Sequence, residues 1–433
     1  METKLARIRE IAERKPDEVF TSVCHLLNEE MLMQCHRELD GNKATGVDQV
    51  TKADYEKCLY ENISSLVERL KKKSYRPQPV RRTYIPKGDG KSKRPLGIPA
   101  HEDKIVQMGL NKILQAIYEP KFLDLSYGFR PGRSCHDALR ALTRIIERGK
   151  INYIVEVDIR GFFDHVDHEW LMKFIGHRIN DPSLKRLIVR FLKAGIMEDG
   201  IIGATEEGTP QGAIVSPTLA NIYLHYVLDL WFSKAVKKNC RGQAEMIRYA
   251  DDFVCCFQHK DDAEKFLTAL INRLAKFNLK IAEDKTKMFM FGRYAEENHK
   301  RRGLGKPQTF DFLGFTHYCG KSRNGKFRVK HRTSRKKFKA KVKDFKEWIK
   351  SVRNCDTADI MRTVRAKLLG HYRYYGITDN SRMIAKYMYE IIKLLFKWLN
   401  RRSQRKSFTV EKFRLFLAQH KLPTPKIYVS IYG

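Results

Sequence analysis

Apolar residues along the chain follow two spacings, which predict helices in some stretches and strands in others. The first 70 residues are polar with mixed charge and favour helices, broken at 40–42 and near Gly46. Ser134 is followed three positions later by an acidic residue, as at a helix start, and apolar residues then recur at 139, 142, 145 and 146. This spacing places them on one face of an amphipathic helix.

Strands are expected in the middle of the chain. Residues 151–157 form a mostly apolar, β-branched run ending at Asp158, which predicts a buried strand. Proline, glycine and basic residues are frequent in 75–99 and indicate strands joined by tight loops. The Ser-Pro pair at 216–217 is expected to cap and open a long helix through Trp231. The alternation of helices and strands predicts a mixed α/β core.

Charge is distributed unevenly along this pattern. The 433 residues include 84 lysines and arginines against 50 acidic residues, a net charge of +34. Residues 321–433 hold 31 basic and 7 acidic residues, and 321–343 alone holds 12 basic residues and no acidic one. We expect a domain boundary there, with helical spacing returning only around Phe345. So basic a chain indicates a polyanionic partner, foremost a nucleic acid.

The composition argues against several classes of protein. Hydrophobic residues make up 42% of the chain, which is enough for ordinary cores. No apolar run reaches the length of about 18 residues needed to span a bilayer, and the N-terminus lacks a secretory segment, so a membrane or secreted protein is not expected. The nine scattered cysteines form no Cys-x-x-Cys pair. We interpret them as buried free thiols of a cytoplasmic protein.

An acidic pair stands out within this basic chain. Residues 247–257 indicate a hairpin with Asp251 and Asp252 at its turn, although a solvated turn explains the pair alone equally well. If the strand ending at Asp158 lies beside this hairpin, the carboxylates converge. Two such charges about 4 Å apart repel by roughly 4 kcal/mol at an effective dielectric of about 20 unless a cation neutralises them. Carboxylates suit Mg²⁺, and two ions would stabilise the attacking and leaving oxygens of a phosphoryl transfer.

The motif Tyr249-Ala250-Asp251-Asp252, with an upstream strand ending on Asp158, resembles the palm of reverse transcriptases. More specifically, the chain is similar to group II intron-encoded reverse transcriptases, or maturases, because eight motifs occur in that family's order over most of its length. Besides these two, the motifs lie at 85–87, 93–99, 126–134, 208–217, 283–286 and 312–315.

The resemblance implies an α/β (α+β) right-hand polymerase, whose fingers and palm, with an antiparallel palm sheet, are followed by a helical thumb. The implied domains are a template-contacting extension at 1–60, fingers and palm at 61–318, a thumb or maturase X domain at 319–395, and a short basic DNA-binding region at 396–433. No cysteine pairs or His-Asn-His pattern follow. The chain therefore resembles the shorter group IIC type without an endonuclease domain, and a bacterial-type cytoplasmic location is expected.

The family's metal-binding roles carry over to matching positions. Asp158 and Asp251 would both ligate the same two Mg²⁺ ions, for which Mn²⁺ is expected to substitute. Asp252 would be the third catalytic carboxylate. The main-chain carbonyl of Ile159 would complete the metal shell.

Nucleotide-binding roles carry over in the same way. Lys87 and Arg94 would grip the triphosphate, for which the arginine fork is suited; two exposed basic residues are the alternative interpretation. Gln211 would lie beside the nucleotide. Lys285 would lie near the leaving pyrophosphate, where a cation offsets developing charge.

Phe163 lies five residues past Asp158, at the family's position for the gate that excludes a ribose 2′-hydroxyl. A bulky ring there leaves the hydroxyl no room and offers it no hydrogen bond, which favours deoxynucleotides. The alternative is a core phenylalanine, which we expect for neighbouring Phe162. Ala213 departs from the family's usual second glycine, and its methyl group would narrow the nucleotide pocket slightly.

Nucleic-acid contacts are expected in the C-terminal quarter. The run 321–343 would line the duplex channel through salt-sensitive phosphate contacts, with a solvated tail as the alternative. Residues 370–376 resemble the family's aromatic thumb motif, where arginine and tyrosine would contact backbone or bases; burial of the tyrosines in the thumb core explains them at least as well. The individual residues expected to contact nucleic acid are Arg335, Lys336, Lys337, Arg373, Arg401 and Arg402.

These motifs predict an RNA-directed DNA polymerase that copies RNA into cDNA by two-metal phosphoryl transfer and binds its intron RNA as a maturase, assisting splicing and retrohoming. The expected partners are group II intron RNA, an RNA template with a DNA primer, dNTPs and a DNA target. No membrane partner is expected, and the oligomeric state is open. A splicing cofactor with a vestigial site is disfavoured by the intact carboxylates, and an RNA-dependent RNA polymerase by Phe163.

Overall fold

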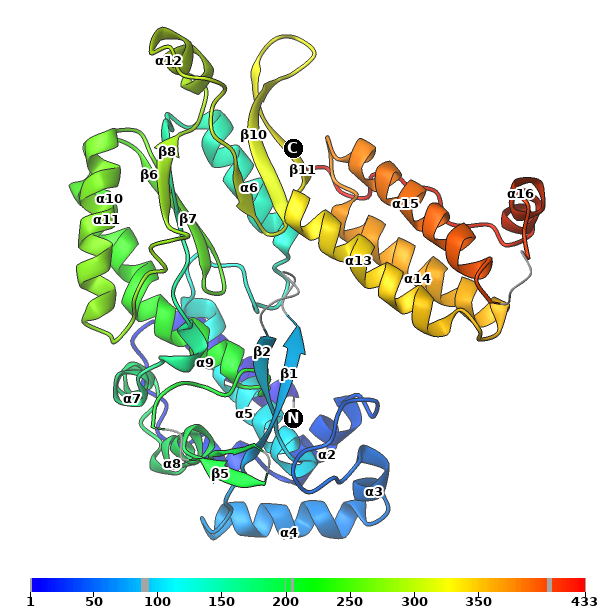
Figure 1. Cartoon of the computed structure of the whole chain (residues 1–433). Helices are drawn as coiled ribbons and strands as arrows, with labels where there is room; N and C mark the ends of the chain where they lie inside the picture. The colour runs from blue at the N-terminus through cyan, green and yellow to red at the C-terminus, as the bar shows by residue number, and fades with distance from the viewer. Residues whose placement is uncertain (1, 87–92, 199, 204–205, 403–406, 433) are drawn as a thin grey trace.

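The N-terminal part of the chain is helical, as predicted. The computed structural model describes residues 2–86, 93–198, 200–203, 206–402 and 407–432 (Figure 1). Asn28 and Thr51 cap two of the first helices by accepting main-chain hydrogen bonds. These helices pack on or beside α5 (His101–Tyr118), which is largely buried. They are α1 (Glu2–Arg14), α2 (Glu29–Glu38), α3 (Lys52–Glu56) and α4 (Leu59–Lys71).

Strands follow in the stretch where proline and glycine predicted them. β1 (Val80–Pro86) and β2 (Lys93–Ile98) pair antiparallel. β1 also pairs in parallel with β4 (Ile196–Glu198), and β5 (Ile201–Gly203) completes a sheet in the order β2-β1-β4-β5. The connection between β1 and β2, which includes Lys87, lies outside the described residues.

A second sheet forms the centre of the molecule. Its strands run antiparallel in the order β6 (Ala244–Tyr249), β7 (Asp252–Phe257), β3 (Tyr153–Val157) and β8 (Lys287–Met290). Both faces are buried, because Val155 and Val157 pack into one hydrophobic core while Ile154 packs into another. Burial on both faces explains why β3 is apolar at every position except Glu156 instead of alternating.

Helices cover both faces of this sheet. α6 (Cys135–Arg148) packs on one face, and it begins with the predicted cap, in which Ser134 and Asp137 bind each other's main-chain nitrogen atoms. The core on the other face includes residues from four more helices. These are α7 (His168–Gly176), α8 (Pro182–Leu192), α9 (Ser216–Leu224) and α11 (Lys260–Ala275).

The start of α9 differs from the prediction. Val215 occupies the N-cap position without a side-chain hydrogen bond, so Ser216 is not the cap. The Ser216 hydroxyl donates instead to the carbonyl of Pro210, at 2.9 Å, in the preceding loop. The helix continues past Trp231 through π-helical turns at His225–Asp229 and Phe232–Val236, and ends with α10 (Lys237–Asn239).

The basic run at 321–343 is divided between a hairpin and a helix. β9 (Phe310–Phe312), β10 (Phe315–Lys321) and β11 (Phe327–Thr333) form an antiparallel sheet. α13 (Arg335–Val352) begins well before Phe345, so the expectation of a later helix was wrong. Ser334 caps α13, and Phe338 and Val342 already pack against a core at helical spacing, while basic residues between them stay exposed.

The C-terminal helices project to one side of the molecule (Figure 1). α13, α14 (Thr357–Tyr375) and α15 (Ser381–Leu399) pack together, and α16 (Val410–Gln419) lies at their far end. The chain then returns to α6, where the carbonyl of Ser430 accepts a hydrogen bond from Arg140. α12 (Ala295–Arg301) precedes the three-stranded sheet. None of the described helices is long and apolar enough to cross a membrane.

Candidate active site

Three carboxylates meet at one end of the central sheet. Asp251 occupies the turn of the β6–β7 hairpin, and Asp252 is the first residue of β7. β3 pairs with β7 so that Val157 lies opposite Phe253, which brings the next residue, Asp158, to the same end. The expected position of this strand beside the hairpin is therefore confirmed.

The carboxylates oppose one another's ionisation. Loss of water around Asp252, with the charges of Asp251 and Asp158, raises its pKa to about 6, although solvent still reaches the side chain. Burial and the charge of Asp158 also raise the pKa of Asp251. Lys285 donates to Asp158 Oδ2 at 2.6 Å, and this hydrogen bond raises the pKa of the lysine. A positive charge among the three acids is therefore favoured.

The chemistry of this donor set fits a divalent cation, because carboxylate oxygens are the ligands that Mg²⁺ prefers. The set is not closed around an ion. In the part of the chain that the structure describes, no three acidic, histidine or cysteine side chains are gathered closely enough to hold a metal. Lys285 occupies one oxygen of Asp158, so an incoming cation would compete with its ammonium group.

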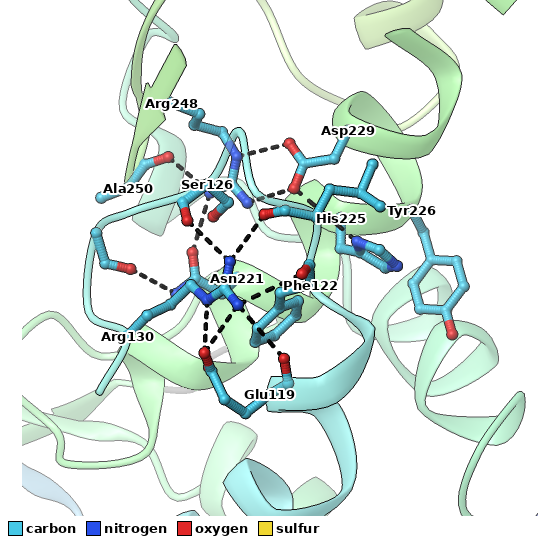
Figure 2. Close-up of polar contacts among 12 residues, drawn as sticks. Glu119, Phe122, Ser126, Arg130, Asn221, His225, Tyr226, Asp229, Arg248 and Ala250 are labelled. Carbon is cyan, nitrogen blue, oxygen red and sulfur yellow. Dashed lines mark hydrogen bonds and ion pairs between the residues drawn. The ribbon is translucent and has the colours of Figure 1, made fainter. Parts of the chain in front are cut away.

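A buried arginine holds the turn that carries Asp251 (Figure 2). Arg248 is fully buried and donates through Nε and Nη2 to the two oxygens of Asp229, at 2.7 and 2.5 Å. Its Nη1 donates to Asn221 Oδ1 and to the main-chain carbonyl of Ala250, each at 2.9 Å. Ala250 has a φ of 58°, a region that costs a residue other than glycine energy. The guanidinium group thus fixes a strained residue next to Asp251.

The segment around Gly128 supports the same turn. The nitrogen of Arg248 donates to the carbonyl of Leu125, and its carbonyl accepts from the nitrogen of Tyr127. Asn221 Nδ2 donates to the carbonyl of Gly128 at 2.8 Å. A Cβ atom at Gly128 would lie 2.3 Å from the nitrogen of Ala250, so only glycine fits there. The motif at 126–134 is therefore a support for the acidic turn.

Sequence reasoning missed Arg248, Asp229 and Asn221 as site residues. The available signal was Arg248 itself, a charged residue inside an apolar strand directly before Tyr249. Charged residues are almost never fully buried unless paired, so an arginine in a buried strand implies a buried acidic partner. Asp229 lies in a helix that reads as ordinary core, so its role depends on the fold.

A groove of about 930 Å³ opens in front of the acidic turn. Its walls come from β2, the β6–β7 hairpin, α13 and α14. The predicted residues that line it are Arg94, Asp251, Asp252, Lys336 and Lys337. Arg94 is exposed, and its charge opposes the rise in the pKa of Asp251. Acids and bases thus face each other across one groove.

The other predicted nucleotide residues that the structure describes, Phe163, Gln211 and Lys285, do not line this groove. Phe163 is half-buried, with its ring 5.4 Å from that of the buried Phe162 in an edge-on contact. The carbonyl of Gln211 accepts from the nitrogen of Gly97, at 2.7 Å, which ties the loop of Gln211 to β2. Ala213 is 5% exposed, so its methyl group is turned into the protein. The expectation that Phe162 is a core residue is confirmed.

The remaining predicted nucleic-acid residues have different surroundings. Arg335 and Arg373 are exposed but do not line the groove. Arg401 lies over the ring of Trp398, and Arg402 donates to Thr357 Oγ1 at 2.8 Å, so each has a structural contact.

The aromatic motif at 370–376 contributes mainly to the core. Tyr372 and Tyr375 are buried, which confirms the interpretation of these tyrosines as core residues. Tyr374 is half-buried, lines the groove and donates its hydroxyl to the carbonyl of Leu313.

Comparison with known proteins adds to this geometry. The profile of the family described as reverse transcriptase (RNA-dependent DNA polymerase) matches residues 85–317. Group II intron-encoded protein LtrA of Lactococcus lactis subsp. cremoris is 43% identical over 231 residues, which cover 52% of this chain and 38% of LtrA. Protein YkfC of Escherichia coli (strain K12) is 38% identical over 242 residues, covering 49% of this chain and 63% of YkfC.

A more distant match is nuclear intron maturase 3, mitochondrial, of Arabidopsis thaliana, 28% identical over 129 residues that cover 30% of this chain and 18% of that protein. The chain thus spans less than two thirds of the length of these relatives. The similarities confirm the resemblance to group II intron-encoded proteins that the motifs indicated.

Proposed function

Because the chain belongs to the reverse transcriptase family, we propose that it is the RNA-directed DNA polymerase of a group II intron and copies RNA into cDNA. One observation carries this proposal: Asp251 and Asp252 line a groove whose other wall is basic, and Asp158 lies at the same end of the central sheet. The basic wall would contact the phosphates of a nucleic acid, and the carboxylates would reach those of the incoming nucleotide through bound cations. Similarity to LtrA and to an intron maturase supports the assignment to a group II intron.

Asp158, Asp251 and Asp252, with the main-chain carbonyl of Ile159, would hold two Mg²⁺ ions, and Mn²⁺ would substitute. When bound, the ions supply charge stabilisation to the attacking and leaving oxygens of the displacement. The protein's own part is to hold the acids in place. The pairing of β3 with β7 positions Asp158, and Arg248 fixes the turn of Asp251.

Basic residues near the acids would bind the incoming dNTP. Arg94 in the groove would contact the triphosphate through its planar fork, together with Lys87, which lies outside the described residues. Gln211 would lie beside the nucleotide, and Phe163 would exclude a 2′-hydroxyl. Lys285 would neutralise the leaving pyrophosphate, which its place beside Asp158 favours.

A right-hand layout is part of the proposal. The sheet β2-β1-β4-β5 would belong to the fingers, the central sheet to the palm and α13–α15 to the thumb (Figure 1). The predicted divisions at 60, 318 and 395 remain predictions. Residue 319 lies inside β10, so the chain has no break in regular structure at that point.

The partners proposed for this site are an RNA template with a DNA primer and dNTPs. Group II intron RNA would bind the same protein and be assisted in splicing and retrohoming, with a DNA target bound during insertion. The exposed Lys336 and Lys337, at the start of α13, would contact the phosphates of the template–primer duplex.

Primer extension on an RNA template with Mg²⁺ tests the proposal. We expect the wild-type protein to incorporate dNTPs and Asp251→Asn to lose extension almost completely, because a metal ligand loses its charge. RNA affinity, measured by filter binding, should stay nearly unchanged, since one acid contributes little to a strongly basic surface.

Asp261→Asn is the matched control, because Asp261 is an exposed acid paired only with exposed Arg241 on the described surface. Full extension by Asp251→Asn would refute the metal-site assignment. A wild-type protein that binds RNA tightly but extends no primer would instead favour the splicing cofactor with a vestigial site.

A further inference from the structure

A second basic cavity lies at the opposite end of the central sheet from the carboxylates. It has a volume of about 770 Å³, and its walls come from α6, the β10–β11 hairpin, Arg293 and the segment 431–432. We call it the outer basic pocket. Seven basic residues line it among the described residues: Arg140, Arg144, Arg148, Arg293, Arg323, Lys326 and Arg328.

The positive charge of this pocket is cancelled locally only in part, because Arg140 pairs with Asp137 at 2.5 Å. Glu147 is the acidic residue of the lining, and its carboxylate accepts from the nitrogen of Val329 at 2.8 Å and lies 3.4 Å from Arg328. Arg144, Arg148 and Arg323 are exposed, and no carboxylate of a described residue pairs with them. Several full charges therefore face the cavity.

The spacing of the arginines on α6 argues for a ligand. Arg140, Arg144 and Arg148 recur every four residues on one face, while Leu142 and Ile146 lie on the buried face. Like charges at this spacing destabilise a helix by about 0.2–0.5 kcal/mol per pair. Arg140 has partners within the fold, but no carboxylate of a described residue pairs with Arg144 or Arg148 to offset that cost, whereas a bound polyanion would turn the repulsion into attraction.

The pocket is built from ordered contacts. Arg140 Nε donates to the carbonyl of Ser430 at 2.9 Å. Arg328 lies 4.2 Å from the centre of the Tyr432 ring, whose hydroxyl donates to the carbonyl of Val329 at 2.9 Å. Segments distant in sequence are thus locked together around the cavity, which presents its charges in a fixed arrangement.

The outer basic pocket is separate from the groove. The two cavities share no lining residue. A shallower hollow beside the pocket also includes Arg144 and Arg148 and reaches Lys150, just before β3, whereas Asp158 follows the other end of that strand. Five residues of strand span about 17 Å at ~3.3 Å per residue, which separates the Lys150 side of the pocket from Asp158 along β3.

We propose that the outer basic pocket is a second phosphate-binding site, which holds the backbone of a folded RNA while the groove holds the template–primer. This inference rests on the proposed function, because a polymerase that stays on its intron RNA needs two such surfaces. Six of the seven basic side chains are arginines, whose fork matches phosphate oxygens in pairs. Contacts of this kind position an RNA without reading its sequence.

The test combines Arg144→Ala, Arg148→Ala and Arg323→Ala in one protein. Alanine is the best helix former, which suits Arg144 and Arg148 on α6, and Arg323 lies in the turn between β10 and β11. None of the three side chains pairs with a described acid, so the fold should persist. The probe is a folded group II intron RNA transcript, titrated over a range of salt concentrations with a short template–primer duplex already bound. We expect affinity to fall about tenfold or more and the slope of log K against log salt to lose about 2–3.

The matched control removes three exposed lysines elsewhere, Lys265→Ala, Lys276→Ala and Lys280→Ala. It should leave RNA affinity near the wild-type value. Primer extension by the triple arginine-to-alanine variant should also be unchanged. Primer extension separates this inference from the proposed function, because a wild-type protein that extends no primer would overturn the proposed function alone.

Three results would overturn the inference. One is an unchanged affinity and slope for the RNA. Another is an equal loss in the lysine control, which would indicate a general charge effect. The third is an equal loss of binding to a DNA duplex of matched length, which would show that the pocket does not serve RNA.

Discussion

The ring of Phe163 packs edge-on against Phe162 and is still half-exposed, so one side of it remains available to a ligand. We expect Phe163→Ala to raise ribonucleotide incorporation relative to deoxynucleotide incorporation, because a methyl group leaves room for a 2′-hydroxyl. Single-nucleotide extension with dNTPs and rNTPs measures the ratio. Phe163→Tyr, which keeps the bulk, should retain discrimination, and an unchanged ratio in Phe163→Ala would refute the gate.

Arg248 makes four hydrogen bonds that a lysine cannot reproduce. We expect Arg248→Lys to lower the free energy of unfolding by about 3–5 kcal/mol, because the buried Asp229 loses its two-pronged partner. The rate of primer extension should fall much more than the KM for dNTP rises, since the turn of Asp251 loses its tie to Ala250. Denaturant unfolding and steady-state extension measure the two effects.

Arg69→Lys is the control for this prediction. Arg69 also donates through two nitrogen atoms to both oxygens of one acid, Glu102, at 3.0 and 2.7 Å, but it lies outside the segments that hold the acidic turn. A loss of stability with a much smaller loss of extension rate is expected. Equal losses of rate in the two variants would mean that Arg248 acts only through stability.

At the scale of the element, α14 carries a buried histidine whose proton binding makes folding sensitive to acid. Burial lowers the pKa of His371 to about 3, and its ring stacks on Tyr387 with centres 3.6 Å apart. Above pH 6.5 the ring is neutral in both the folded and the unfolded chain. Below pH 6.5 the unfolded chain takes up a proton first, so stability is lost as the pH falls toward the folded pKa.

Through His371, the wild-type protein should lose about 2 kcal/mol of stability between pH 7 and pH 5, from about 1.4 kcal/mol per pH unit over about 1.5 pH units. We expect His371→Phe to lack this part of the loss. Denaturant unfolding followed by circular dichroism at both pH values measures this difference. The exposed His25 provides the control, since His25→Gln should leave the pH dependence as it is. The same dependence in His371→Phe and wild type would contradict the assignment.

Elements with local signals could be predicted from the sequence. The capped start of α6, the apolar run of β3 and the hairpin around Asp251 each depend on residues a few positions apart. The errors arose where distant or loop contacts compete with local preference. Ser216 donates to the carbonyl of Pro210 instead of capping α9. α13 begins earlier than predicted because Phe338 and Val342 pack against a core, although the basic residues around them hide this apolar spacing in the sequence.

The acidic part of the site could be predicted, but its support could not. Asp158 and Asp251 were recognisable because strand ends and turns are visible in sequence. Arg248 reaches Asp229 and Asn221 only because the fold brings the helix that contains both to the end of β6, and Figure 2 shows the resulting contacts. Pairing of this kind depends on packing, which no spacing in the sequence reports.

At the scale of the whole molecule, basic residues line two separate cavities, the groove and the outer basic pocket. Lys336 and Lys337 line the groove, whereas Arg335 and Arg373 are exposed outside it. We expect Lys336→Ala with Lys337→Ala to weaken template–primer binding and to reduce its salt slope by about 1–2, because two phosphate contacts are lost. Fluorescence anisotropy across a salt series measures both. Arg335→Ala with Arg373→Ala should change the slope less, and equal slopes would contradict the assignment of the groove.

Because residues 430–432 return to α6, the groove and the outer basic pocket can form at different times during synthesis. Chains begin to fold from the N-terminus while the ribosome is still extending them. A nascent chain that has emerged to residue 400 already contains the central sheet, the three carboxylates and α13–α15. It lacks Ser430, 290 positions from its partner Arg140, and the Tyr432 ring beneath Arg328. The polymerase groove can therefore form before the outer basic pocket, and only a chain extended past residue 432 has both.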